Sequence, residues 1–547
     1  MPSTSSQRRS TIRRRLHAAI ARRVSVDTRA LAVFRVFVAL LILADLGLRS
    51  RNFHLFYTEH GVVPRSLARE LAAPYAFSFY HLSTSTTVIA ALFVLQGLFA
   101  LQLLVGYKTR LAMIVSFLFV ISLDHHNPLV LSYADTLFRL LTFWAIFLPL
   151  GERWSIDAVH RDREPRTAIS SVASALILGQ MVFMYVSNGV IKSVSSTWRA
   201  GEAAPLVLGL DEMTFLLGDT VREFTTLLGY GGMLWYLMMV GGWLLLVTHG
   251  WSRLALLTLY VGGHLSFALT VRIGAFAYVA LAGLVLFVQT PVWDRLEAVV
   301  ITRLESQRLE SLHARLRATA RSVPNPRVTS PQIRQYRSIT YTATMAVIVV
   351  TILFVTVVIA AQSVATVADH DGEQPIEEVI DEMLVETLHE TTGVREVNTV
   401  ASSLGIDQPI GWGVFAPEPR TVDRYYVFAA VTEDGEYVDV YNDRPLTYDR
   451  PYDELQNQYG TYRERFYMNS VRRGGYHTDT AAMLADHHCT RWASENDDEL
   501  VQINMYIVSE QVTHETISDP EGRDRQYRQF YRHSCASNVL QPIPTPH

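Results

Sequence analysis

Nine apolar segments dominate this chain. A helix that crosses a bilayer needs about 20 mostly apolar residues, because lipid offers no hydrogen-bond partner to the backbone. The segments lie at roughly 31–48, 85–105, 111–123, 136–150, 168–188, 228–248, 253–271, 275–290 and 341–362. Two of them, 111–123 and 136–150, are short, and tilted or partly re-entrant segments are alternatives there. The pattern predicts an α-helical polytopic membrane protein with about nine transmembrane helices.

The distribution of arginine predicts the orientation of these helices. Short loops rich in Arg and Lys stay in the cytoplasm. Residues 1–27 carry seven such arginines, and with nine spans every other strongly basic loop falls on the same side. We therefore expect a multi-pass protein of the cell membrane, with a cytoplasmic N-terminus and an extracytoplasmic C-terminal region.

The two parts of the chain differ strongly in charge. Residues 364–547 carry 33 acidic and 14 basic residues, whereas residues 1–363 carry 19 acidic and 34 basic residues. Such asymmetry indicates two environments. An acidic, lysine-poor surface suits high-salt media, so a halophilic source is expected.

These features divide the chain into five parts. A basic cytoplasmic segment (1–27) precedes a membrane domain (28–295). A basic cytoplasmic loop (296–340), a last transmembrane helix (341–363) and an acidic extracytoplasmic domain (364–547) follow.

The acidic domain has the pattern of an α+β fold with a small antiparallel sheet. Helices are expected at 375–391, 452–470 and 478–494, and strands at 425–432, 436–441, 500–512 and 526–532. The first two strands are joined by Glu433-Asp434-Gly435, a hairpin signal. Cys489 and Cys535 form a disulfide or remain two free thiols; their spacing does not decide between these.

Lys192 is the first candidate for chemistry. Only Lys108 and Lys192 are lysines among 48 basic residues. Arginine stays charged, whereas lysine can lose its proton and act as a base. Lys108 is explained as a basic residue of a cytoplasmic loop. Lys192 lies at the end of an apolar segment on the expected outer side, where the alternative is a lysine that anchors a helix end. Trp198 nearby suits an interfacial position.

Two polar sites accompany Lys192. His264 lies within an apolar segment after two glycines, where an ionisable residue is expected to face a cavity or the bundle interior. A hydrogen-bonded structural histidine is the alternative. His126 and Asn127 belong to a polar cluster in an expected outer loop. Acid–base or hydrogen-bonding roles fit this cluster better than a metal, because no third ligand stands at suitable spacing.

Several function classes are excluded by the sequence. It contains no phosphate-binding glycine loop, no His-Glu-x-x-His and no Gly-x-Ser-x-Gly. A net-acidic outer domain would repel phosphate, so no nucleic-acid partner is expected. Membrane lipid is the partner that the apolar segments imply.

Four motifs carry a resemblance to a known family. They are Phe56-Tyr57-Thr58-Glu59-His60-Gly61-Val62-Val63-Pro64-Arg65, Val105-Gly106-Tyr107-Lys108-Thr109-Arg110-Leu111, Phe147-Leu148-Pro149-Leu150-Gly151-Glu152-Arg153-Trp154-Ser155-Ile156-Asp157 and Gly411-Trp412-Gly413-Val414-Phe415-Ala416-Pro417. In this order they resemble the HTTM (horizontally transferred transmembrane) domain, which is related to vitamin K-dependent gamma-carboxylase. The fourth motif resembles the start of the external tail in microbial members.

The resemblance implies an activity. The enzymatic member oxygenates a reduced quinone of the vitamin K or menaquinol type, and the base so created removes a proton from glutamate, which then captures CO2. O2 and CO2 would be co-substrates, and an exported polypeptide would be the substrate. Lys192, ahead of Trp198, matches the family lysine that deprotonates the hydroquinone. His264 matches a histidine ahead of a Gly-x-Phe-x-Tyr segment that ends here at Tyr278, and His126 with Asn127 loosely matches a further histidine.

The sequence departs from the family at two points. Ile191 replaces the first lysine of the family pair, and one extra residue separates Lys192 from Trp198. The leading hypothesis is a gamma-carboxylase-like membrane protein with Lys192 as base, supported by His264 and by His126 or Asn127, with Trp198 and Tyr278 beside the quinone. The alternatives are a non-catalytic membrane protein whose acidic domain binds partners, and a quinol oxidoreductase without carboxylation.

Overall fold

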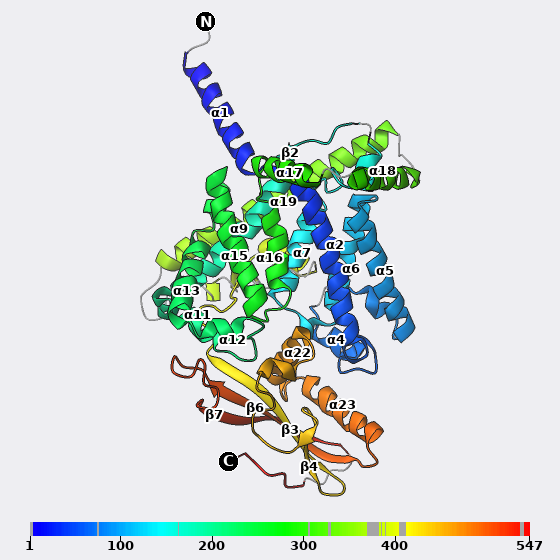
Figure 1. The fold of residues 1–547 in the computed structure, drawn as a ribbon, viewed down its shortest axis with the longest axis vertical. Coiled ribbons are helices and arrows are strands. Elements are labelled where there is room, and N and C mark those ends of the chain that lie inside the picture. Colours follow the sequence, from blue (N-terminus) through cyan, green and yellow to red (C-terminus); the bar gives the residue numbers. More distant parts are fainter. Residues whose placement is uncertain are drawn as a thin grey trace.

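The computed structural model describes residues 4–546 except 74–75, 162, 305–306, 326–329, 369–381, 384–385, 389, 404–411 and 536–540. The chain is mostly helical, and a separate five-stranded sheet domain follows the helices. The ribbon in Figure 1 shows a bundle of long helices with the sheet domain at one end.

Four helices are long and apolar enough to cross a membrane. They are α2 (Thr28–Arg51), α5 (Thr86–Val105), α9 (Val172–Ser193) and the stretch Pro331–Gln362 of α19 (Pro331–Ala368). α16 (Phe276–Val285) and α17 (Thr290–Leu304) would make a fifth span only as one broken unit, because they meet at a bend of 97°.

The remaining apolar segments also form helices. They are α6 (Thr109–His126), α7 (Tyr133–Ala145), α13 (Thr225–Val240) and α15 (Trp251–Thr270). Each is shorter or less apolar than the four spanning helices. The helical positions agree with the sequence, whereas the count of nine spans and their orientation stay predictions.

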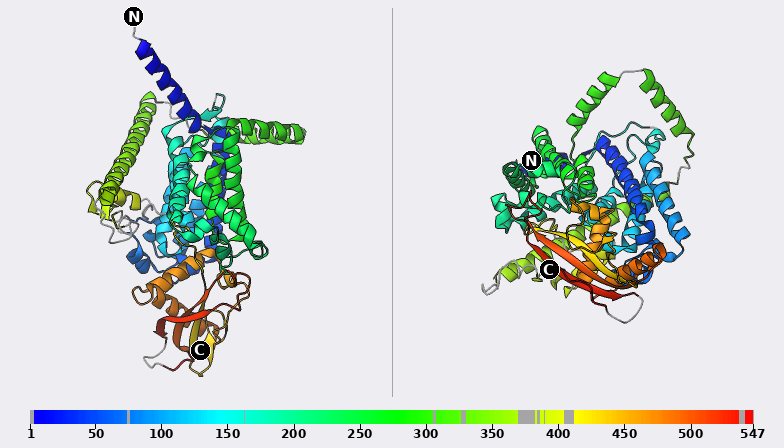
Figure 2. Two further views of the ribbon diagram at one scale, coloured as in Figure 1. Left: turned by 90° about the vertical axis from the view of Figure 1, so that its left-hand side faces the viewer. Right: turned by 60° about the horizontal axis from the view of Figure 1, so that its bottom comes forward.

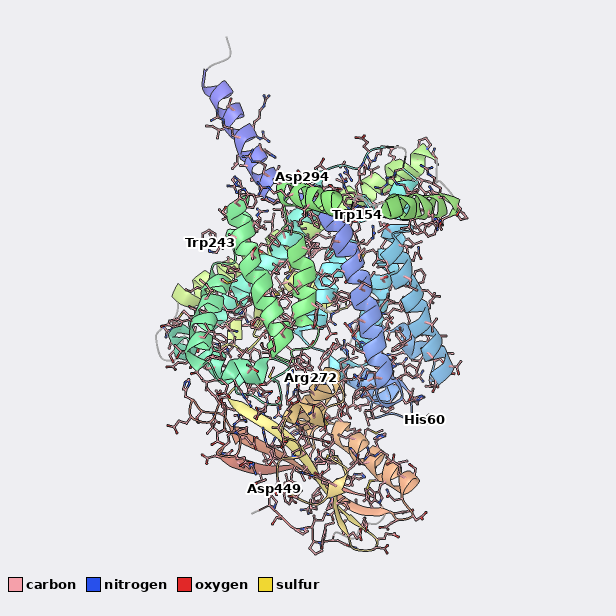
Figure 3. All side chains as sticks on the ribbon, in the orientation of Figure 1. His60, Trp154, Trp243, Arg272, Asp294 and Asp449 are labelled. Carbon is pink, nitrogen blue, oxygen red and sulfur yellow. A yellow bond between two sulfur atoms is a disulfide. The ribbon has the colours of Figure 1, made fainter. Side chains whose placement is uncertain are left out.

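Three helices, two of them rich in arginine, lie at the opposite end of the bundle from the sheet domain. α1 (Thr4–Arg23), α17 and α18 (Gln307–Ser322) lie at one end, and α1 projects away from the bundle (Figures 1 and 2). Figure 3 places Trp154 and Asp294 at this end, and places Arg272 and His60 at the end that faces the sheet. This separation agrees with the charge pattern of the sequence.

The C-terminal domain is an antiparallel sheet in the order β5-β4-β3-β6-β7. The strands are β3 (Val422–Thr432), β4 (Tyr437–Asp439), β5 (Arg444–Pro445), β6 (Leu500–Gln511) and β7 (Arg525–Ser534). The expected hairpin is present, since β3 pairs with β4 and the turn includes Gly435 at a φ of 84°. The α+β pattern of the sequence is therefore confirmed in the sheet.

Two of the three expected helices can be compared. The helix expected at 478–494 is α23 (Thr480–Glu495). The helix expected at 452–470 was placed too early: α22 (Tyr462–Gly474) begins after Gly460, where the Thr461 side chain accepts a hydrogen bond from the Glu464 amide and caps the helix. The expected helix at 375–391 lies largely outside the described residues. A disulfide joins Cys489 of α23 to Cys535, just after β7.

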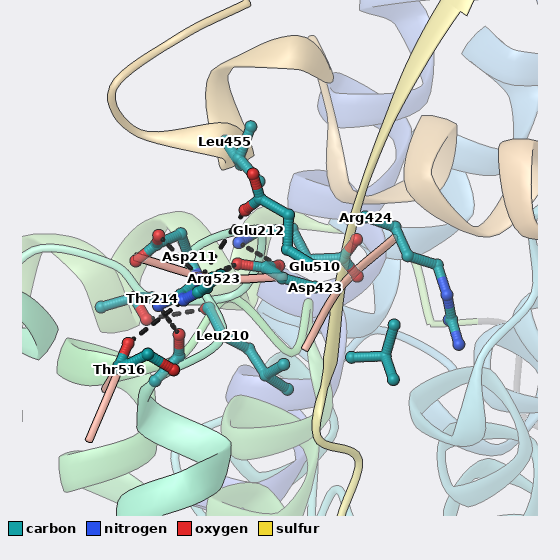
Figure 4. Close-up of polar contacts among 12 residues, drawn as sticks. Leu210, Asp211, Glu212, Thr214, Asp423, Arg424, Leu455, Glu510, Thr516 and Arg523 are labelled. Atoms are coloured by element: carbon teal, nitrogen blue, oxygen red, sulfur yellow. Dashed lines mark hydrogen bonds and ion pairs between the residues drawn. The ribbon is translucent and has the colours of Figure 1, made fainter. Parts of the chain in front are cut away.

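A buried ionic cluster joins the sheet domain to the membrane domain (Figure 4). Arg523 is fully buried and donates to Asp423 at 3.0 Å, to Asp211 at 3.2 Å and to the Gly209 carbonyl at 2.8 Å. Asp423, at the start of β3, accepts hydrogen bonds from the backbone amides of Asp211 and Glu212. We call this set of three side chains, Asp211, Asp423 and Arg523, the ionic junction.

The first prediction concerns the ionic junction. Arg523→Met should destabilise the protein by up to roughly 3–5 kcal/mol, because it removes the cation that lies nearest to Asp423. Arg450, at 2.5 Å from Asp211 and 3.7 Å from Asp423, compensates part of this loss. Thermal unfolding of the detergent-solubilised protein measures this change. Arg528→Met, at an exposed position of β7, is the matched control. Equal destabilisation by both substitutions would contradict the assignment.

The second prediction concerns pH. Burial, with the nearby charges of Arg491 and His487, lowers the pKa of His488 on α23 from 6.5 to about 3. Between these pH values the unfolded chain binds a proton that the folded chain does not, so stability falls as pH falls. From pH 7 to pH 5 this group should cost about 2 kcal/mol.

The comparison of two variants isolates this effect. His488→Phe should reduce the loss of thermal stability between pH 7 and pH 5, whereas His477→Phe, at an exposed position, should leave it unchanged. An unaltered pH dependence in His488→Phe would show that the imidazole is not buried as a neutral group.

Candidate functional site

A cavity of about 690 Å³ contains three of the residues singled out from the sequence, Lys192, Trp198 and His264. Its walls come from α9, α13, α15 and the chain segment at 412–415. Most of the lining is apolar and aromatic, with few polar groups. A volume of this size and such a lining are typical of small-molecule sites. We call it the lysine cavity.

Lys192 occupies the last turn of α9 and is 2% exposed. Its Nζ donates to Asn188 Oδ1 at 2.9 Å, one helical turn earlier, and to the carbonyl of Val414. The Trp198 ring lies beneath it, with Nζ 4.4 Å from the ring centroid. No carboxylate in the described part of the chain forms an ion pair with Lys192. Its neighbours are therefore neutral dipoles and a π face.

The segment at 412–417 completes this environment from the C-terminal part of the chain. The carbonyls of Trp412 and Val414 accept hydrogen bonds from Asn188, and the Phe415 carbonyl accepts one from Trp198 Nε1 at 2.9 Å. Phe415 has a φ of 53°, a region that non-glycine residues rarely adopt. The backbone of this segment thus holds the side chains around Lys192 in place.

His264 lies on α15 and is fully buried. Its Nε2 shares a hydrogen bond of 2.8 Å with the Tyr185 hydroxyl of α9, while its Nδ1 has no hydrogen-bond partner among the described residues. The preceding Gly263 is required for packing, because a Cβ there would lie 2.4 Å from the Trp235 ring. Gly263 therefore permits the close approach of the Trp235 side chain of α13, whereas a Cβ at Gly262 would meet nothing within 4 Å.

The lysine cavity extends to the outer surface of the helix bundle. Its lining includes Leu227, Tyr230 and Leu234 of α13 and Leu259 of α15, which are between 44% and 74% exposed. Exposed apolar side chains on apolar helices face lipid in a membrane. The lining thus runs from exposed apolar side chains of α13 and α15 to the buried Lys192.

His126 and Asn127 lie outside the lining of the lysine cavity. His126 Nε2 is 3.3 Å from the Tyr57 carbonyl, and its ring contacts the ring of His81. Asn127 accepts a hydrogen bond from the Leu129 amide and donates one to the Phe56 carbonyl. Through these hydrogen bonds both residues stabilise the turn between α6 and α7.

Tyr278 lines a different cavity, of about 560 Å³. The wall of this second cavity contains a buried ionic cluster in which Arg49 pairs with Asp124 at 2.7 Å and Arg463 of α22 pairs with Asp135 at 2.9 Å. Val271 lines both cavities, so the connection between α15 and α16 separates them. Of the six predicted site residues, the structure brings together Lys192, His264 and Trp198.

Sequence reasoning missed Asn188, Tyr185 and the backbone of the segment at 412–417 as parts of the site. The segment did carry a signal, since it is one of the four motifs of the resemblance. Asn188 lies four residues before Lys192, which is the spacing of neighbours on one helical face. Tyr185 carries no such signal, because its partner lies 79 residues away.

Comparison with known proteins supports a family for the membrane domain. The family model of the HTTM domain matches residues 24–293. Comparisons with curated proteins and with solved structures give no match.

The third prediction tests the burial of Lys192. An apolar amine-acylating reagent should modify exposed Lys108 at least about tenfold faster than Lys192, which reacts only when the cavity opens. Peptide mass spectrometry quantifies the two sites separately. Trp198→Ala should accelerate modification of Lys192, whereas Trp243→Ala, at an exposed position outside the cavity, should not. Equal rates at both lysines in the unmutated protein would contradict the burial of Lys192.

Proposed function

We propose that this chain, whose residues 24–293 form an HTTM domain, is a quinol-dependent membrane enzyme related to gamma-carboxylase. The proposed reaction is the oxygen-dependent carboxylation of glutamate in an exported polypeptide. One observation carries the proposal: Lys192 and His264, chosen separately from the sequence, line a single cavity that extends to the lipid-facing surface.

The residues of the lysine cavity fit a reduced quinone. Such a molecule combines a polar ring with an apolar tail, and the cavity combines polar groups, among them Asn188, Lys192 and His264, with an apolar opening that would face lipid. Trp198 and Trp235 offer aromatic faces to a ring, and the unpaired Nδ1 of His264 offers a hydrogen-bonding site. When bound, the quinol would supply the electrons that reduce oxygen.

Lys192 would act as the base. As a neutral amine, its Nζ accepts a proton from a ring hydroxyl, which arginine cannot do because its guanidinium stays protonated. The ammonium that forms is stabilised by Asn188 Oδ1, by the Val414 carbonyl and by the Trp198 ring. These acceptors are in place before the transfer, so little reorganisation accompanies it.

A supporting role follows for His264. Its hydrogen bond to Tyr185 fixes the imidazole plane, which leaves Nδ1 as the ring nitrogen without a partner among the described residues. The imidazole ring would therefore position a polar substituent of the quinol ring by a hydrogen bond. The proposed topology places the sheet domain outside the cell, where an exported polypeptide would meet the end of α9.

The second candidate function is quinol oxidation without carboxylation. It is favoured by the position of His126 and Asn127, which do not line the lysine cavity. The resemblance matches them only loosely to a histidine that would stabilise the reacting oxyanion or carbanion. Removal of a quinol proton requires only Lys192 and its neighbours. A purely anchoring role requires neither the cavity nor a buried lysine within it.

The fourth prediction tests the base. Purified protein supplied with a short-chain quinol, oxygen and bicarbonate should oxidise the quinol, and Lys192→Arg should lower the rate by roughly 10²–10⁴-fold. Lys108→Arg is the matched control, because it makes the same substitution at the other lysine. Lys192→Met tests whether any bulky replacement has the same effect as arginine.

Two results separate the alternatives. Lysine-dependent incorporation of labelled CO2 into a glutamate-containing peptide supports carboxylation, whereas lysine-dependent oxidation without incorporation supports the second candidate. If both Lys192 variants oxidise the quinol as fast as the unmutated protein with the fold intact, Lys192 is not the base.

A further inference from the structure

A third cavity lies at the end of the bundle opposite the sheet domain. It has a volume of about 560 Å³ and lies between the start of α6, the strand β2 (Ala168–Ile169), the start of α9 and the first part of α19. β2 marks this end of the bundle in Figure 1. We call it the arginine cavity. It is distinct from the lysine cavity, which lies at the other end of α9.

The lining of the arginine cavity is basic. Arg110, Arg166 and Arg337 line it, and none of its described lining residues is acidic. Ser170, Ser171, Ser338 and Tyr341 complete its polar wall, and the Tyr341 hydroxyl donates to the Phe147 carbonyl at 3.4 Å. Guanidinium and hydroxyl groups together are the donors that proteins use to bind phosphate.

The positive charge of this cavity is poorly compensated. Arg166 pairs with Glu152 at 3.1 Å, but Glu152 also pairs with Arg161 and Arg163. Arg110 and Arg337 have no carboxylate partner in the described part of the chain, and their charges repel each other. The Arg110 guanidinium lies 5.7 Å from the centroid of the Tyr341 ring. Several like charges around one cavity favour an anion within it.

The cavity also lies at the level expected for lipid headgroups. Arg337 precedes by four residues the apolar stretch of α19 that begins at 341, and Tyr341 is of the type that gathers at membrane interfaces. Only 6% of the apolar window of α19 is buried inside the protein. Acyl chains therefore have room along α19 directly beside the basic groups.

We propose that the arginine cavity binds the phosphate of an anionic phospholipid, and that this phosphate bridges α19 to the helix bundle. Its charge would offset the repulsion between Arg337 on α19 and Arg110 on α6. The same chemistry would accept a free phosphate ion, so the experiment must separate the two sources. The proposal does not depend on the function proposed for the lysine cavity.

Native mass spectrometry of the purified full-length protein tests this site. Titration with phosphatidylglycerol should give one saturable adduct, and titration with phosphatidylcholine should give much weaker binding. Arg337→Gln and Arg110→Gln should each weaken the phosphatidylglycerol adduct roughly fivefold. Arg321→Gln, an exposed arginine of α18 outside the cavity, removes the same charge and should have no comparable effect.

A second pair of variants keeps every arginine. Ser338→Glu places a carboxylate in the cavity and should abolish the adduct, whereas Ser322→Glu on α18 should not. Saturable binding of inorganic phosphate with the same dependence on Arg337 and Ser338 would support the site and assign it to free phosphate. Equal effects of the cavity variants and their controls would overturn the proposal, because binding would then follow net charge alone.

Discussion

The ionic junction between Arg523, Asp423 and Asp211 is the interaction on which the candidate site depends. It fixes the start of β3 against the loop that follows α11 (Ala203–Leu208) of the membrane domain. The segment at 412–417 lies just before β3, so its carbonyls reach Asn188, Lys192 and Trp198 only while the sheet domain is docked. Charged groups outside the lining of the cavity therefore contribute to its geometry.

A second set of buried charges ties the same two domains together. Arg463 of α22 pairs with Asp135 at 2.9 Å and also pairs with Asp45, and both aspartates belong to the membrane domain. Removing the partner of a buried charge is strongly destabilising. The membrane domain alone would leave these carboxylates with less cationic compensation. The two domains are thus expected to fold and act as one unit, although their net charges suggest separate environments.

The sequence predicted the elements better than their long-range contacts. Apolar length located the helices and alternation located β3, β6 and β7, because these signals are local. The rarity of lysine pointed to Lys192, because a lysine retained among so many arginines indicates a role that arginine cannot fill. The contact between Lys192 and Val414 spans 222 residues, so no local pattern contains it. The predicted start of α22 was too early, because the capping role of Thr461, which marks the true start of the helix, was not recognised in a polar stretch of sequence.

The length of α9 sets the spacing between its two ends. Its 22 residues correspond to about 33 Å of helix, close to the thickness of the apolar part of a bilayer. Ser171, which caps its start, lines the arginine cavity, and Lys192 at its end lines the lysine cavity. A phosphate held at the first cavity would fix the depth of α9 in the membrane. Because the helix is rigid, Lys192 would then be held at the opposite interface, where the polar head of an amphipathic quinol is expected.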